Sequence, residues 1–526
     1  MNKQFIKKSD TFRKKAALIM IITLFFSAVG GCTSKEEESM QNTLVYGSTD
    51  YTAINPALFE HGEINSLLFL GLTAHDADNN VVPAAAESWS YDKNDISYHF
   101  KLREGLTFHD GELLTSSDVK FTVESIMNPD NNSENASNFE DVKSVDIIDD
   151  YNLVIKLKAP NVAILDYLTI GILPEHLLSG EPLSDNEFNQ SPVGAGPYMM
   201  TSWDFGQSIT LESFDDFYLG SPKIERIIFK IVDDSDARAL QLKSGEIDLA
   251  QVAPKSMNIF EGNDGYTVYK MDTSDYRGIM YNFNSDFFAK HRELPSILSY
   301  AIDRQAIVDS VLLGNGEAAY SPLQKTEFNN PDMKKPEYDP DMAVKLLQEN
   351  GWVRGEDGYF YKDNEQLAFE INNGQADQVR TDMSNICAQY FQTIGVNATV
   401  KIVAETDWEK QDAYLIGWGS PFDPDDHTYK VFGTGKGANY SYYSNEKIDD
   451  ILKSARETDD KPQRIKLYNE FQDEFAADPP YTLIAYIDSI YVDKNNINGL
   501  TENTLLGHHG VCIFWNIYDW EIQQIN

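Results

Sequence analysis

Apolar residues follow both strand-like and helix-like periods along most of this chain. In "YHFKLREGLTF", Tyr98, Phe100 and Leu102 alternate with polar residues, which predicts a half-buried strand. The segment "SDARALQLKSGEIDLAQV" predicts a helix that ends near Gly245 and passes directly into a strand. Elements of both kinds recur throughout, so we expect a mixed α/β protein.

Two further helices carry recognisable start and stop signals. In "DPDMAVKLLQENGW", Asp339 is placed to cap the helix and Gly351 to end it. Its apolar face would contain Met342, Leu346 and Leu347. The segment 294–314 predicts a helix that restarts after Asp303 and ends at Gly314.

The chain begins with basic residues followed by the apolar run from Ala16 to Val29. This run is too short to span a bilayer comfortably and is typical of an export signal. It leads through "VGGC" to Cys32 and a polar stretch, an arrangement that resembles a bacterial lipobox. We therefore predict a lipoprotein signal peptide at 1–31 and a lipidated tether at 32–41; an ordinary secretory signal with a stray cysteine is the alternative. Lipid on Cys32 would hold the exported protein at the outer face of the bacterial cell membrane.

Composition excludes partners better than it identifies one. The 526 residues carry a formal net charge of −40, which disfavours nucleic acid and anionic lipid, since both require clustered Lys and Arg. The length predicts two to four domains. The sequence contains no GxSxG, HExxH or GxxxxGK[ST] motif, so we expect no enzyme and no catalytic residues. Cys387 and Cys512 leave a disulfide open, although Cys387 also fits the apolar stripe of a helix.

Several spans, taken in order, are similar to the extracellular solute-binding proteins of peptide- and nickel-type ABC importers, family 5. They include "AAAESWSYDKNDISYHFKLREGLTFHDGELLTSSDVKFTVESI", "SPVGAGPYMM", "FDDFYLGSPKIERIIFKIVDDSDARALQLKSGEIDLAQV" and "YSNEKIDDILKSARETDDKPQRIKLYNEFQDEFAADPPYTLIAY". The resemblance covers essentially the whole mature chain. It implies a monomeric receptor that captures a small ligand and presents it to a membrane permease with its ATPase, without a resident cofactor.

The same resemblance implies a two-lobed periplasmic-binding-protein-like fold of the large type II class with an extra subdomain. We expect lobe I at 42–77, 191–280 and 495–526. The extra subdomain would fill 78–190, and lobe II would fill 281–494. The ligand would lie in the cleft between the lobes.

The ligand class depends on the cleft segment "GWGSPFDPDDH". Peptide-binding relatives usually carry an aspartate after "GW" that pairs with the peptide amine, whereas Ser420 and Pro421 stand here. Trp418 and Phe422 resemble the nickel-branch pattern, in which aromatic residues line the pocket. We therefore favour nickel or a nickel chelate as cargo, with a di- or oligopeptide as the alternative. Asp423 is the residue that would meet a peptide amine.

Histidines are the expected metal donors, because nickel(II) favours imidazole nitrogen. His508 and His509 lie in the glycine-flanked turn "GHHG", and His61 lies in the N-terminal cleft segment that the resemblance indicates. The alternative is that these residues are solvated in loops. The loop "YKVFGTGKGANY" after "DP" has no histidine, whereas His427 lies earlier, in "DPDDH".

Three further residues are expected in the cleft: Tyr276, Arg277 and Trp515. Aromatic rings and a guanidinium suit a planar ligand that carries carboxylates. An ordinary core or surface position is the alternative for each.

Overall fold

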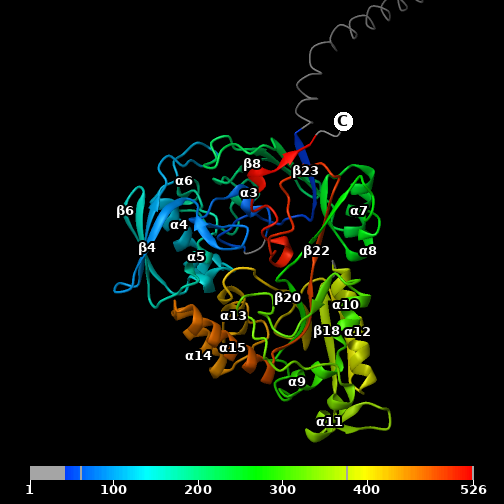
Figure 1. The fold of residues 1–526 in the computed structure, drawn as a ribbon. Coiled ribbons are helices and arrows are strands. Elements are labelled where there is room, and N and C mark those ends of the chain that lie inside the picture. Colours follow the sequence, from blue (N-terminus) through cyan, green and yellow to red (C-terminus); the bar gives the residue numbers. More distant parts are fainter. Residues whose placement is uncertain (1–41, 60–61, 375–376, 524–526) are drawn as a thin grey trace, which may run out of the picture.

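The structure is a computed structural model that describes residues 42–59, 62–374 and 377–523. It is a mixed α/β protein built around two large sheets, with a smaller sheet to one side (Figure 1). The predicted signal peptide, tether and Cys32 lie outside the described residues. No helix of the described ranges is long and apolar enough to span a bilayer.

The first large sheet has seven strands in the order β12-β22-β11-β1-β10-β9-β8. Its central strand β1 is parallel to β10 and β11 on either side. Helix α7 (Ser235–Ser244) begins where the Asp234 side chain accepts from Ala237 N, and ends at the left-handed Gly245, as predicted. The strands are β1 (Thr43–Ser48), β8 (Tyr198–Asp204), β9 (Ser208–Ser213), β10 (Arg226–Ile231), β11 (Leu249–Val252), β12 (Thr267–Met271) and β22 (Ser489–Asp493).

The second large sheet has six strands in the order β14-β21-β13-β20-β18-β19. Its strands are β13 (Tyr276–Tyr281), β14 (Gly316–Ala318), β18 (Ala368–Gly374), β19 (Asn397–Val403), β20 (Ala413–Trp418) and β21 (Tyr481–Ile487). Every residue of β13 and β20 is buried. The surrounding helices are α9 (Leu294–Leu298), α10 (Arg304–Ser310), α11 (Pro340–Glu349), α12 (Gln378–Thr393), α13 (Asp425–Phe432), α14 (Glu446–Glu457) and α15 (Lys461–Ala477).

The smaller sheet, in the order β4-β5-β7-β6, lies within the predicted extra subdomain. Its strands are β4 (Ala86–Asp92), β5 (Ser97–Leu102), β6 (Val142–Asp149) and β7 (Asn152–Leu157), and the nearby helices are α4 (Ser116–Met127), η2 (Ala136–Phe139), α5 (Ile164–Tyr167) and α6 (Glu175–Leu178). Tyr98, Phe100 and Leu102 of β5 are buried, as their alternation predicts.

Two strands belong to a different large sheet from the one that the expected lobe boundaries imply. Strand β13 was expected in lobe I, but it pairs with β20 and β21 of the second sheet. Strand β22 was expected in lobe II, but it pairs with β11 and β12 of the first sheet. The chain therefore crosses between the sheets just before Tyr276 and just before Ser489. The division into lobes stays a prediction with these shifted crossings.

The helix signals are largely confirmed. Asp339 accepts from Met342 N at the start of α11, and Gly351 follows that helix in a left-handed conformation. Leu347 is buried on its apolar face. The helix after Asp303 ends at Ser310 rather than Gly314, because Leu313 and Gly314 both adopt positive φ.

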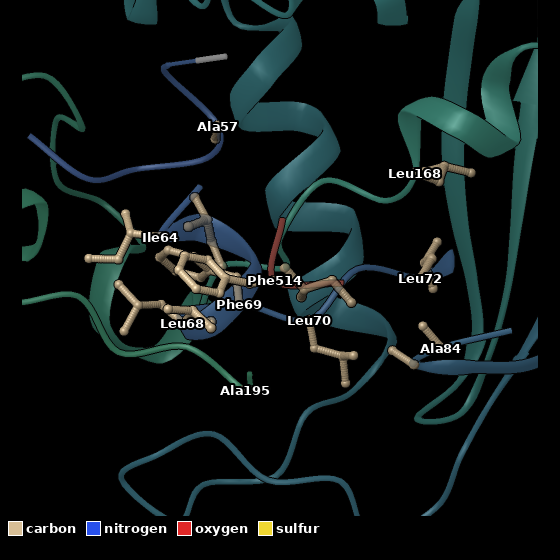
Figure 2. Close-up of a cluster of buried hydrophobic side chains, with 14 of the residues drawn as sticks. Ala57, Ile64, Leu68, Phe69, Leu70, Leu72, Ala84, Leu168, Ala195 and Phe514 are labelled. Atoms are coloured by element: carbon tan, nitrogen blue, oxygen red, sulfur yellow. The ribbon is translucent and has the colours of Figure 1, made fainter. Parts of the chain in front are cut away.

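The C-terminal segment packs into the hydrophobic core that also contains Leu44 and Tyr46 of the first large sheet. Phe514 lies among Ile64, Phe69 and Leu70, which come from the opposite end of the chain (Figure 2). A separate core fills the second sheet and contains Cys387, whereas Cys512 packs against the first core. Both cysteines are free. This packing brings residues 507–518 beside the N-terminal segment, where they form one wall of a cavity.

Candidate functional site

A cavity of about 550 Å3 is lined by residues of the predicted lobe I, of the predicted extra subdomain and of the segment that follows β20. Apolar and aromatic side chains form much of its wall, among them Phe69, Phe422 and Trp515. The lining comes from segments 56–83, 135–139, 166–171, 197–219, 419–427 and 507–518. A cavity of this size and composition is typical of a site for a small ligand.

His508 lies in this wall, in the short helix η5 (His508–Gly510). The residue is only 5% exposed, so a solvated turn is wrong for His508. Its backbone N donates to Gly419 O at 2.9 Å, and its ring Nδ1 lies 2.8 Å from Asp275 Oδ1. A carboxylate can only accept, so Nδ1 carries the proton, and Nε2 is the nitrogen through which the ring can bind a metal.

His75 and Phe422 lie at or next to strands of different sheets, and their rings stack on each other. The two rings lie 3.8 Å apart at 7°, and both line the cavity. His75 ends β2 (Thr73–His75), and its Nε2 lies 3.0 Å from Asp166 Oδ1. The sequence predicts Phe422 as a cleft residue but gives no indication of His75, because a lone histidine after a short strand carries no signal of its partner.

His427 also lines the cavity, from α13. It is buried, its Nε2 lies 3.8 Å from Asp426 Oδ2, and its ring lies 5.6 Å from that of Trp418. The motif "DPDDH" contained it, but the family pattern directed attention to the loop that follows.

Four predicted cleft residues lie outside the lining of the cavity. Tyr276 is fully buried in β13, where its ring packs against Tyr486 and burial raises the pKa of its hydroxyl. The Arg277 guanidinium is held by Asp275. Trp418 is buried in β20 against Tyr440. Tyr276 and Trp418 therefore lie in the core, and Arg277 pairs with Asp275, the same carboxylate that contacts His508.

Asp423 is the fourth such residue, and it is already paired. Its two carboxylate oxygens accept from Arg464 Nη2 and Nη1 at 2.7 and 2.8 Å. Meeting a peptide amine would require this bidentate pair to break.

The predicted donors are only partly described. His61 lies outside the described residues, and of His509 only the backbone, within η5, is described. Among the side chains that the structure does describe, no three of the His, Cys, Asp and Glu type lie close enough to hold a metal ion. Of the predicted set, the structure brings His508, Phe422 and Trp515 together at one cavity.

An ionic network joins the extra subdomain to α13 and α14 beside the cavity. Arg456, almost fully buried, donates to Asp425 Oδ2 at 2.7 Å and to Asp141 Oδ2 at 3.2 Å. Tyr167, which lines the cavity, donates to the same Asp425. Glu140 accepts from Lys436 at 2.7 Å. In Figure 1, α13 and α14 lie next to α5 of the extra subdomain.

Comparison with known proteins places the chain among transport receptors. The bacterial extracellular solute-binding proteins, family 5, match residues 80–440. The oligopeptide-binding protein AppA of Bacillus subtilis is 29% identical over 548 residues, covering 98% of this chain and 99% of the relative. Protein XP55 of Streptomyces lividans is 30% identical over 476 residues, covering 88% and 87% of the two chains.

Two solved structures share the fold over nearly the whole chain. NikZ from Campylobacter jejuni, in complex with Ni(L-His), is 36% identical with a TM-score of 0.87, and the match covers 91% of this chain and 99% of NikZ. AppA from Bacillus subtilis, in complex with a nonapeptide, is 30% identical with a TM-score of 0.84, covering 92% and 99%.

The fold and the family match are those of a substrate-binding protein of an ABC importer. The chain belongs to the bacterial extracellular solute-binding proteins, family 5. Proteins of this family bind small ligands outside the cell membrane, work with a membrane permease, and are not enzymes.

Proposed function

We propose that this protein captures nickel(II) as a small chelate in the cavity and delivers it to its permease. His508 would supply one imidazole donor, and His61 and His509 would be the further protein donors. Phe422 and Trp515 would contact the chelator. Nickel is here the cargo, and the protein would remain unchanged chemically.

The observation that carries this proposal is the environment of His508. Its buried ring lies in the cavity wall with Nδ1 against Asp275. Metal-binding histidines usually donate their second ring N–H to a carboxylate or carbonyl, which fixes the ring and the tautomer. Similarity to NikZ, whose structure contains Ni(L-His), supports the same ligand class.

A chelate fits the site better than a bare ion. The described side chains alone do not form a set of three donors, whereas nickel(II) requires several nitrogen or oxygen ligands. A bound L-histidine would supply donors of its own and occupy part of the 550 Å3 cavity.

A short peptide is the second candidate. The cavity has largely apolar walls, and AppA, the relative with a bound nonapeptide, is similar over most of the chain. The pairing of Asp423 with Arg464 weighs against this candidate, because Arg464 already binds both oxygens of the carboxylate that was expected to meet the peptide amine.

Calorimetric titration of metal-stripped protein distinguishes the two. We expect saturable binding of Ni2+ with L-histidine, weaker binding of Ni2+ alone, and none of a random peptide pool. His508→Ala should weaken the nickel–histidine affinity by about tenfold or more, as losses at metal-supporting residues do. His176→Ala is the matched control, because its Nε2 lies 2.8 Å from Asp110 outside the cavity. Binding of peptides only, or unchanged nickel binding by His508→Ala, would contradict the proposal.

We further propose that Cys32 is lipidated and anchors the exported protein. Cys32→Ser should move the protein from the membrane fraction to the medium or the soluble extracytoplasmic fraction. A membrane fraction that is unchanged in the variant would show that another feature retains the protein.

A further inference from the structure

The cavity wall carries acidic side chains but, among its described residues, no lysine or arginine. Among its described lining residues, none is Lys or Arg, and the two undescribed residues of the same segment are Glu60 and His61. Four carboxylates line it: Glu63, Asp76, Asp166 and Asp426. A ligand in this cavity therefore meets acceptors and negative charge on several sides.

Within the described part of the chain, only one of these carboxylates has a lysine or arginine within ion-pair distance. Asp426 Oδ1 lies 3.1 Å from Lys430 Nζ, whose side chain is nearly fully buried. Asp166 has His75 as its ion-pair partner, and Glu63 accepts hydrogen bonds from the Tyr46 and Ser48 hydroxyls, at 3.4 Å each. Within the described residues, no Lys or Arg therefore lies beside Glu63 or Asp166 to compete with a cationic group of the ligand.

Asn138 supplies a second, independent observation on the same wall. It lies in η2, which packs against α5, the helix that carries Asp166. Asn138 is 5% exposed and lines the cavity, yet its Oδ1 accepts no hydrogen bond from any described residue. A buried acceptor without a donor is costly, so its position at a ligand cavity indicates that the ligand supplies the donor.

We infer that Asn138 and Asp166 form a subsite for a positively charged hydrogen-bond donor on the ligand, such as an ammonium group, and that the cavity excludes polyanionic ligands. This inference rests on the proposed function only in taking this cavity as the place where ligand binds. The subsite would therefore distinguish nickel chelates by their net charge. A nickel–histidine cation would bind favourably, whereas nickel complexes of citrate or EDTA would bring further negative charge to the acidic wall.

The test uses the full mature chain and titrates four probes: Ni2+ with L-histidine, Ni2+ with EDTA, and two tripeptides that differ only in one Lys or Glu. Asn138→Leu removes the acceptor at similar size, and Asn138→Asp keeps it and adds charge. Asn373→Leu is the matched control, because Asn373 is also fully buried with a partnerless Oδ1 but lies outside the cavity lining.

We expect Ni2+ with L-histidine to bind at least tenfold more tightly than the EDTA complex. Asn138→Leu should weaken the favoured probe at least fivefold, while Asn138→Asp and Asn373→Leu bind it as tightly as the wild type or more tightly. If either leucine variant fails to fold, the Asn138→Asp result and the charge preference of the wild type still decide.

The outcomes separate this inference from the nickel proposal. If only the Lys tripeptide binds, the nickel proposal is wrong and the charge preference holds. If the EDTA complex binds as well as the histidine complex, or the Glu tripeptide as well as the Lys tripeptide, the inference is wrong while ligand binding at the cavity stands. Absence of binding by all four probes overturns both.

Discussion

Two neighbouring regions of this protein contain clusters of carboxylates. They differ in whether lysine or arginine side chains pair with those carboxylates. In the network between the extra subdomain and α14, Glu140, Asp141 and Asp425 surround Arg456, with Lys436 beside Glu140. In the cavity, Glu63 and Asp166 lie without a Lys or Arg within ion-pair distance among the described residues.

The difference is informative because a buried charge is costly unless it is paired. In the network the chain supplies the cation, so these carboxylates are satisfied within the protein and hold two parts of it together. In the cavity, no lysine or arginine of the described chain pairs with Glu63 or Asp166. A positively charged ligand would supply the missing partner. Carboxylates therefore stabilise the fold in the first region, and we infer that they recognise the ligand in the second.

The largest expected effect comes from removing the cation of the network. Arg456→Met leaves Asp425 and its neighbours buried without their partner, which should lower the free energy of unfolding by about 3–5 kcal/mol. Chemical denaturation measures this. Lys93→Met is the control, because the exposed Lys93–Asp459 pair crosses the same interface and should have no measurable effect. Equal losses in the two variants would break the comparison.

A buried neutral histidine gives the second effect. Burial lowers the pKa of His109 to about 4, against an ordinary value of 6.5. The unfolded chain therefore binds more protons between these values, so stability should be lost as the pH falls from 6.5 to 4, by on the order of 2 kcal/mol. The measurement is denaturation at several pH values with His109→Gln as reference. A wild type and variant with parallel pH profiles would contradict the assignment.

The third effect reverses the first. Asp166→Asn should leave stability unchanged or slightly raised, since it removes a charge that has no lysine or arginine partner among the described residues and keeps an oxygen for His75. Affinity for a cationic ligand should fall by about 1 kcal/mol, a factor of roughly five. Asp141→Asn, in the paired network, should instead lower stability and spare binding. Thermal unfolding with and without ligand measures both effects. A loss of stability in Asp166→Asn, or a loss of ligand binding in Asp141→Asn, would contradict the comparison.

The smallest effect concerns the aromatic wall. Phe422→Leu removes the stack with His75, which should weaken ligand binding by about 0.5–1.5 kcal/mol. Phe205→Leu disrupts a similar stack on Trp203 far from the lining and serves as control. Titration of both variants tests this; an unchanged affinity for Phe422→Leu would remove the stack from the site.

Local patterns predicted the elements well because their causes are local. The alternation of Tyr98, Phe100 and Leu102 and the cap at Asp339 both appear in the structure as expected. The sheet membership of β13 was wrong because strand pairing is decided by distant partners, here β20 and β21. Its fully buried pattern offers no alternation that would indicate which sheet it joins.

Only part of the candidate site could be predicted from the sequence, namely the residues that the family resemblance indicated and that also line the cavity. His508, Phe422 and Trp515 do line one cavity. His75 and Asn138 were missed because their significance lies in contacts with segments far along the chain, which no local spacing reveals. Asp423 looked like a ligand residue by motif, but its partner Arg464 lies on a separate helix.

A crystal structure of the protein grown with Ni2+ and L-histidine, with anomalous data collected at the nickel edge, tests the central claim most directly. We expect one strong anomalous peak in the cavity, within bonding distance of His508 Nε2, with a histidine chelator against Trp515. A cavity filled by peptide density without an anomalous peak, or a nickel ion bound away from His508, would contradict it.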